Sequence, residues 1–366
     1  MASVTTVNLL ALATSLPYAN YLSTLSTNTT TPTFSFLAYN STFSTSILAP
    51  NATARLLHSF PDWEPFHEAG VYDRGTNSMY ITSNYNIPSG LSNPINMTIV
   101  SLDDYSIRST RYPGIHEPNG GTSYYPPGSN PNTTDPLLLF CDEGDFVHAS
   151  ALTTLDPSTN TTTVILNNYL GRNFSSVNDV RQHPETGDLW FTDADYGYFQ
   201  YFRPAPTIPK HVYRFSPSTG EIQVVADGFV QPNGLEFSPD FQTFYVSDTG
   251  AVGFERNFTR PATVYAFDVV DQKVLRNRRV FAYPDSGFPD GVHTDTAGNV
   301  WAGVGDGVHI WNAEGTLLGK LHIGKTSNNF AFIPGGVLVF SNDDLWLVEG
   351  LAVNGREVCL DFGVCD

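Results

Sequence analysis

Residues Phe288-Pro289-Asp290-Gly291-Val292-His293-Thr294-Asp295 place a carboxylate directly before a glycine and begin a short alternating pattern that ends in Trp301. The Asp-Gly pair after proline predicts a tight turn, because glycine tolerates positive φ and proline fixes φ just upstream. Versions of this stretch recur at intervals of roughly 40–60 residues, which is close to the period of propeller blades. They begin at Glu68-Ala69-Gly70, Asn119-Gly120-Gly121, Asn178-Asp179, Asn233-Gly234 and Asn328-Asn329.

Each repeat continues into a turn and a second apolar run, such as Leu189-Trp190-Phe191 or Phe244-Tyr245-Val246. Segments 211–215 and 263–268 alternate between polar and apolar residues and are predicted as further strands. Helical periodicity is nearly absent. Six units of about four strands each predict an all-β fold, a six-bladed β-propeller over residues 55–366. In a closed propeller, oxygen-bearing residues at one phase of the repeat converge on the central channel.

The N-terminal region has a different composition. An apolar run from Val7 to Leu16 predicts a signal peptide over residues 1–19, although no Lys or Arg precedes this run. Residues 20–54 are rich in Ser, Thr and Asn, and we expect a loosely packed arm. Secretion and N-glycans are therefore expected, with a soluble intracellular protein as the alternative. Glycosylation sequons begin at Asn28, Asn40, Asn51, Asn96, Asn132, Asn160, Asn173 and Asn257.

The charge of the chain limits its partners. Asp and Glu number 36 against 18 Lys and Arg, giving a formal net charge of −18. Such a surface repels phosphate backbones, so a nucleic-acid partner is not expected. No apolar run is long enough to span a bilayer. The acidity favours a cation, and a solubilising surface is the simpler explanation of most of it.

Three cysteines cannot form a disulfide framework. Cys359 and Cys365 lie close together near the C-terminus and are candidates for a pair, which would leave Cys141 free. The neighbours of Cys141, which include Asp142 and Glu143, do not lower a thiol pKa, so a catalytic cysteine is not expected.

The repeated blade-entry residues indicate a metal site. Calcium takes six to eight oxygen ligands from carboxylates, amide carbonyls and water, whereas zinc prefers nitrogen and sulfur ligands. A lone Asn-Gly pair is usually only a turn, so the hypothesis depends on the joint periodicity. We expect one Ca²⁺ or another divalent ion in the central channel, with the ligands Glu68, Asn178, Asn233 and Asp290.

Several of these motifs together resemble the gluconolactonase/regucalcin family, and most closely the fungal lactonohydrolases that open aldonate and pantoyl lactones. The similarity runs from about Glu64 to Leu347, and it depends on an ordered set of motifs that are individually weak. The set includes Phe66-His67-Glu68-Ala69, Ser176-Val177-Asn178-Asp179-Val180, Pro232-Asn233-Gly234-Leu235-Glu236, Pro289-Asp290-Gly291-Val292-His293, Asn167-Asn168-Tyr169-Leu170-Gly171-Arg172 and Gly303-Val304-Gly305-Asp306-Gly307.

The resemblance implies calcium-dependent hydrolysis of a small γ- or δ-lactone to its hydroxy acid, in a fungal secondary-metabolite or sugar-lactone pathway. It implies that Glu68, Asn233 and Asp290 bind the metal and that Asp290 also acts as the catalytic base. Asn178 would complete the site or hold water and substrate. Many members carry an arginine two residues before this asparagine, where the present chain has Ser176. A substrate clamp of that kind is therefore missing.

Further substrate-binding candidates are Asn119 and the histidines beside the proposed ligands, His67 and His293, for which a structural role is the alternative. The aromatic segment 196–209 is expected to form a rigid loop over one face. Two rival functions stay open because propellers host many activities. One is a non-hydrolytic biosynthetic cyclase or lyase, and the other is a non-catalytic calcium-binding propeller.

Overall fold

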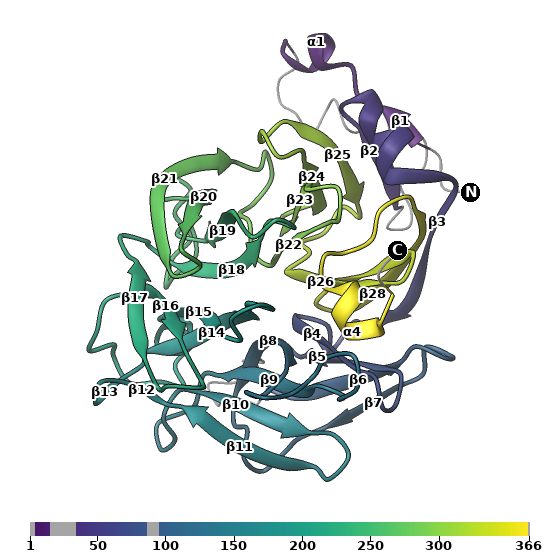
Figure 1. The fold of residues 1–366 in the computed structure, drawn as a ribbon. Coiled ribbons are helices and arrows are strands. Elements are labelled where there is room, and N and C mark those ends of the chain that lie inside the picture. Colours follow the sequence, from purple (N-terminus) through teal and green to yellow (C-terminus); the bar gives the residue numbers. More distant parts are fainter. Residues whose placement is uncertain (1–3, 15–33, 86–94, 365–366) are drawn as a thin grey trace.

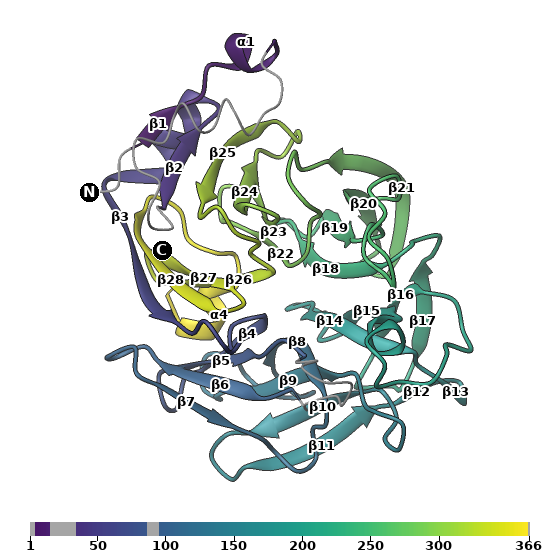
Figure 2. The same ribbon diagram turned by 180° about the vertical axis from the view of Figure 1, so that it is seen from behind.

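The repeats form six antiparallel sheets around a central axis, as predicted (Figures 1 and 2). The computed structural model describes residues 4–14, 34–85 and 95–364. In each blade the first strand contacts the first strands of neighbouring blades, so these strands line the axis. The first blade contains β4 (Glu68–Asp73), β5 (Ser78–Thr82), β6 (Met97–Ser101) and β7 (Ile107–Thr110). The second contains β8 (Pro118–Tyr124), β9 (Leu137–Asp142), β10 (Ala151–Asp156) and β11 (Thr161–Leu166). The third contains β14 (Ser176–Gln182), β15 (Leu189–Ala194), β16 (His211–Phe215) and β17 (Ile222–Ala226).

The other three blades repeat this order. The fourth blade contains β18 (Pro232–Phe237), β19 (Thr243–Asp248), β20 (Thr263–Val270) and β21 (Val274–Ala282). The fifth contains β22 (Val292–Thr294), β23 (Val300–Val304), β24 (Gly307–Trp311) and β25 (Leu317–His322). The sixth contains β26 (Asn329–Ile333), β27 (Gly336–Ser341) and β28 (Asp344–Leu351), together with β3 (Leu48–Ser59). Smaller elements are the pair β12 (Asn168–Tyr169) and β13 (Arg172–Asn173), the short helix α3 (Tyr196–Phe199) and the C-terminal helix α4 (Val358–Phe362).

The N-terminal side of the chain closes the ring. β3 pairs antiparallel with β28 and completes the sixth blade, so the predicted propeller start at residue 55 falls inside a strand. Before it, β2 (Ser35–Ala38) extends the fifth blade, pairing with β25 and with β1 (Val4–Thr6). Residues 34–54 are therefore packed, because apolar residues among the Ser and Thr, such as Phe36 and Phe43, join the core around Trp301. Residues 15–33 lie outside the description, and the signal peptide stays a prediction.

The glycines after the blade-entry residues allow close packing between blades. The predicted turn is wrong for Gly291, which does not have a positive φ. A Cβ atom on Gly291 would lie 2.2 Å from Oδ1 of Asn329, and one on Gly234 would lie 2.4 Å from the carbonyl oxygen of Asp290. In the first blade, Gly70 does adopt a φ of 96°. Glycine is thus required where neighbouring inner strands almost touch, which is a constraint that the local sequence does not reveal.

Aromatic side chains fix the angles between blades. Trp190 of β15 is fully buried, with its ring 5.5 Å from Phe237 and 5.2 Å from Phe244 of the next blade. Trp301 of β23 is likewise buried, 5.0 Å from Phe332 of the sixth blade. Such aromatic pairs contribute roughly 0.5–1.5 kcal/mol beyond their buried area. These contacts hold the inner strands, and the residues at their ends, in fixed positions.

Two further expectations concern the cysteines and membrane-spanning segments. Cys141 is buried and free, whereas Cys365 lies outside the described residues, so its pairing with Cys359 stays a prediction. Among the helices that the structure describes, none is long and apolar enough to cross a membrane.

Candidate active site

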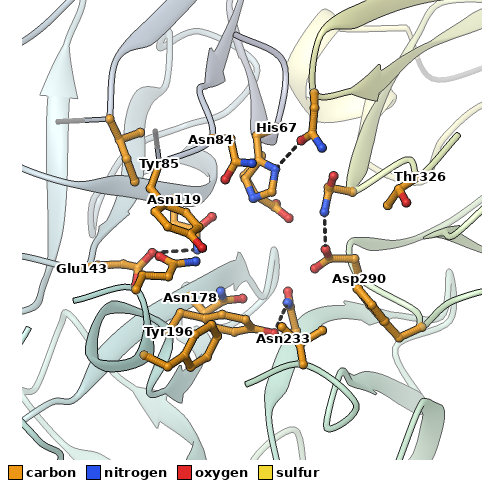
Figure 3. Close-up of a pocket in the computed structure, with 18 of the residues that line it drawn as sticks. His67, Asn84, Tyr85, Asn119, Glu143, Asn178, Tyr196, Asn233, Asp290 and Thr326 are labelled. Carbon is orange, nitrogen blue, oxygen red and sulfur yellow. Dashed lines mark hydrogen bonds between the residues drawn. The ribbon is translucent and has the colours of Figure 1, made fainter. Parts of the chain in front are cut away.

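A cavity of about 210 Å³ lies at the end of the central channel where the inner strands begin. The entry residue of each of the six blades is among the residues that line it, and Figure 3 shows polar side chains directed toward its centre. The structure therefore brings together all four predicted metal ligands, the predicted substrate residue of the second blade and an asparagine of the sixth. In chain order they are Glu68, Asn119, Asn178, Asn233, Asp290 and Asn328.

Buried hydroxyl groups anchor several of these residues through their backbone. In each case a side chain on the second strand of one blade donates a hydrogen bond to the carbonyl oxygen of the entry residue of the next blade. Such a bond ties the position of the site residue to the packing between blades. The bonds run from Thr82 to Asn119 (3.0 Å), from Thr192 to Asn233 (2.8 Å) and from Ser247 to Asp290 (2.7 Å).

The two carboxylates of the ring are buried without a cationic partner. Glu68 and Asp290 are 4% and 6% exposed, and neither forms an ion pair with a described Lys, Arg or His. Asn329 donates a hydrogen bond to Glu68 (2.7 Å), and Asn328 donates one to Asp290 (2.8 Å). Oδ1 of Asp290 has no hydrogen-bond partner among the described residues. Because a buried carboxylate requires a charge partner or a proton, this end of the channel is suited to a cation.

The pKa values of the two groups follow from this environment. Burial, with the charges of Asp290 and Asp179, raises the pKa of Glu68 well above its usual value. Burial raises the pKa of Asp290 to about 7, against the lowering effect of the hydrogen bond from Asn328. In the absence of a cation, the site therefore retains protons that exposed carboxyl groups lose.

The amide groups complete an oxygen-rich set. Nδ2 of Asn233 donates to the hydroxyl of Tyr196 (2.8 Å), which also contacts Thr249, so Oδ1 of Asn233 is left as an acceptor. Nδ2 of Asn328 is engaged with Asp290, and its Oδ1 has no partner among the described residues. Carboxylate and amide oxygens are the ligands that calcium prefers, and the residues present therefore fit such an ion.

The opposite wall of the cavity carries a third carboxyl group. Glu143 is 2% exposed and accepts hydrogen bonds from Nδ2 of Asn119 (3.1 Å) and from the hydroxyl of Ser176. Burial raises the pKa of Glu143 to about 8. At neutral pH this group is largely protonated, so it is able both to donate and to accept a hydrogen bond.

The two predicted histidines lie in different places. His67 lines the cavity, its Nδ1 lies 2.8 Å from Oδ1 of Asn342, and burial lowers its pKa, which favours the neutral ring. His293 does not line the cavity. Its ring lies further along β22, where Nε2 is 3.0 Å from Oδ1 of Asn329 and Nδ1 is 2.9 Å from Glu357. Its contacts are those of the alternative, structural role.

Two other clusters of carboxylates and histidine contain buried cationic side chains. Glu236, His293 and Glu357 lie together, but Arg181 and Arg356 pair with Glu236 at 3.2 and 2.7 Å. The second cluster, Asp285, Asp306 and His309, surrounds the buried Nζ of Lys320, which lies 2.6 Å from Asp285 and 3.1 Å from Asp306. Both clusters are therefore balanced by the protein itself.

Of the pocket residues that were not predicted as site residues, three contribute to the hydrogen bonding described above. Asn328 occupies the blade-entry phase of the sixth repeat, so the repeat itself contained the signal. Tyr196 belongs to the predicted aromatic segment, and only the structure shows that its hydroxyl orients Asn233. Glu143 follows β9 and has no periodic signal, because its position depends on contacts with Ser176 and Asn119.

The fold and the site define a class: six-bladed propellers with a carboxylate- and amide-lined pocket at one end of the channel. The chain belongs to the SMP-30/gluconolactonase/LRE-like family, whose model matches residues 100–338. It is 32% identical over 349 residues to the lactonohydrolase oryL of Aspergillus oryzae, covering 87% of this chain and 74% of that protein. It is also 29% identical over 239 residues to a gluconolactonase of Zymomonas mobilis, covering 62% of this chain and 64% of the relative.

Solved structures share the fold. A gluconolactonase of Xanthomonas campestris superposes with a TM-score of 0.65 at 23% identity, covering 83% of this chain and 91% of that one. A calcium-binding regucalcin of Agrobacterium tumefaciens superposes with a TM-score of 0.57 at 18% identity, covering 83% of this chain and 95% of that one. The family and the propeller predicted from the sequence are thus confirmed.

Proposed function

We propose that this protein is a calcium-dependent lactonohydrolase that opens the ester of a small γ- or δ-lactone and releases the hydroxy acid. The observation that carries the proposal is the pair of buried carboxylates, Glu68 and Asp290, which share a pocket and have no cationic partner among the described residues. The names of the family relatives support lactone hydrolysis as the reaction.

The oxygen donors that would hold the ion belong to four different blades. Because the packing between blades fixes them, the set is preorganised rather than assembled on binding. When bound, the ion supplies electrostatic stabilisation of the negative charge that develops on the ester carbonyl oxygen. The donors are Glu68, Asn178, Asn233 and Asp290.

Asp290 is also the proposed base. Its unpartnered Oδ1 belongs to a residue that lines the cavity, and it would accept a proton from the attacking water. The water oxygen bonds to the carbonyl carbon, the bond from that carbon to the ring oxygen breaks, and the proton passes from Asp290 to that oxygen. Asn119, Asn178 and His67 would hold the lactone ring and orient its ester.

We also propose secretion with N-linked glycans. Seven of the eight sequon asparagines are among the described residues, and five of these are exposed: Asn40, Asn51, Asn132, Asn160 and Asn173. Enzymatic removal of N-glycans should increase the gel mobility of protein recovered from the culture medium. Recovery from cells alone, with no mobility shift, would contradict the proposal.

The direct test is acid release from a panel of γ- and δ-lactones with calcium, after chelation, and after calcium is restored. The proposal predicts turnover that disappears with the chelator and returns with Ca²⁺. Turnover that survives complete chelation would contradict the metal requirement. Calcium binding with no turnover of any lactone would favour a non-catalytic calcium-binding propeller or a cyclase.

A further inference from the structure

The outer part of the pocket differs in chemistry from its polar base. Phe199 and Phe288 line it from two different blades, together with Val252. Phe254, which is 57% exposed, extends this wall outward, with its ring 6.2 Å from Phe199 and 5.7 Å from Tyr201. Exposed aromatic rings that continue a pocket wall form an apolar surface suited to a ligand.

This aromatic wall is firmly anchored. The hydroxyl of Tyr196, at the start of α3, is held by Asn233 and Thr249, and the amide of Gly197 donates to the hydroxyl of Ser176 (3.0 Å). Shortly after the helix, the buried guanidinium of Arg203 donates to four backbone carbonyl groups at 2.8–3.0 Å. The segment that presents Phe199 is therefore a built part of the site.

The described lining of the pocket contains no buried Lys or Arg that could bind a carboxylate on the substrate. Of the described residues that line it, Glu68, Glu143 and Asp290 are acidic, and Arg256 is the sole Lys or Arg. Arg256 is exposed, and its guanidinium lies 6.0 Å from the ring centroid of Phe288. At the start of the third blade, the hydroxyl of Ser176 donates a hydrogen bond to Glu143. A carboxylate on the substrate would therefore find no cationic side chain beside Glu143 and Asn119, whereas a hydroxyl or carbonyl group would find hydrogen-bond partners there.

We propose that the substrate is an uncharged lactone whose ring carries an apolar alkyl or aryl substituent. The ring ester lies at the polar base, a neutral polar group contacts Glu143 and Asn119, and the substituent runs along Phe199 and Phe288 toward Phe254. This inference rests on the proposed lactonase function, and it sets the protein apart from enzymes for polyhydroxylated sugar lactones.

The test compares kcat/KM, with saturating calcium, for γ-butyrolactone, for γ-lactones with alkyl chains of increasing length, for a polyhydroxylated aldonolactone and for a lactone that carries a carboxylate. Each buried methylene should raise kcat/KM by about 4-fold until the chain passes the aromatic wall. The aldonolactone and the charged lactone should be the poorest substrates.

Two variants test whether the alkyl substituent contacts Phe199. Phe199→Ala should lower the ratio of kcat/KM between the octyl-substituted and the unsubstituted lactone by about 10-fold, because the chain loses much of its apolar contact. The control, Leu170→Ala, removes a side chain that is 76% exposed and does not line the pocket, and it should leave this ratio unchanged.

The outcomes separate the two levels of the proposal. Turnover that is independent of chain length, or highest for the polyhydroxylated or charged lactone, overturns the substrate inference and leaves the lactonase intact. An unchanged ratio in Phe199→Ala also overturns it. No turnover of any lactone overturns the lactonase function and this inference with it.

Discussion

The two ends of the central channel hold similar buried carboxylates in opposite electrostatic situations. At the pocket end, Glu68 and Asp290 face amide groups, with no described cationic side chain paired to either. About 10 Å further along the inner strands, at 3.3 Å per residue, Glu236 is paired with Arg181 (3.2 Å) and Arg356 (2.7 Å). Cationic side chains of the protein therefore neutralise the buried carboxylates at the far end, and no described cationic side chain does so at the pocket end.

The pKa values express the same difference. Burial raises the pKa of Asp290 to about 7. Burial also acts on Glu357 at the far end, but His293, Arg356 and Arg181 outweigh it and lower the pKa of Glu357 to about 2. At the far end protein side chains pair with the buried carboxylates, whereas the carboxylates at the pocket end have no described cationic partner.

The largest effect is expected from Asp290→Asn. This variant removes both a charge of the proposed metal site and the proposed base, so kcat should fall at least about 1,000-fold. Circular dichroism should show an unchanged fold. The matched change at the far end, Glu357→Gln, should keep kcat within about 10-fold, because that end supplies no catalytic group. Equal losses in the two variants would remove the distinction between the ends.

A variant that breaks the ion pairs at the far end should be less stable. Arg181→Met leaves Asp179 and Glu236 buried with less compensation, and the free energy of unfolding should fall by roughly 3–5 kcal/mol. Urea unfolding measures this change. Saturating calcium should stabilise the wild type and Arg181→Met equally, so the difference between them should persist, because the disturbed network lies outside the pocket. A difference that disappears in calcium would mean that the far end binds the ion.

Much of the site could be predicted because it follows the repeat. All six blade-entry residues line the pocket, since every inner strand begins at the same end of the channel. His293 lies only three residues beyond Asp290, but three strand residues span about 10 Å, and this displacement takes it out of the cavity. Glu143 and Arg181 could not be assigned, because each also depends on a partner in the next blade, Ser176 and Glu236 respectively, which leaves no local pattern.

A smaller effect is expected from Glu68→Gln, which keeps the shape of the side chain and removes one charge. Calcium affinity should fall roughly 100-fold, because a carboxylate of the donor set becomes a neutral amide. Isothermal titration calorimetry measures the change, with Glu357→Gln as the control that retains wild-type affinity. Unchanged affinity in Glu68→Gln would exclude this carboxylate as a ligand.

The pH dependence of stability gives the smallest expected effect. Without calcium, folded Asp290 keeps a proton between its usual pKa of 3.8 and about 7, whereas the unfolded chain has lost it. Stability should therefore fall as pH rises through this window, and it should fall more steeply in the wild type than in Asp290→Asn. Glu357 should contribute a slope of the opposite sign and only at the acid end of this window, because its stabilisation is lost as pH falls from its usual pKa of 4.5 toward its folded pKa of about 2.

Urea unfolding between pH 4.5 and 7.5 measures these slopes. Saturating calcium should remove most of the decline, because the ion favours the deprotonated carboxylates. Parallel profiles for the wild type and Asp290→Asn in chelator would show that Asp290 does not retain the proton.

The most direct test of the account is a calorimetric titration of Ca²⁺ into chelator-treated wild type, Glu357→Gln and the double variant Glu68→Gln/Asp290→Asn. The account predicts one bound ion per chain in the wild type and in Glu357→Gln, and none in the double variant. A wild type that binds no divalent cation, or a double variant that binds as well as the wild type, would contradict a metal site at the pocket end of the channel.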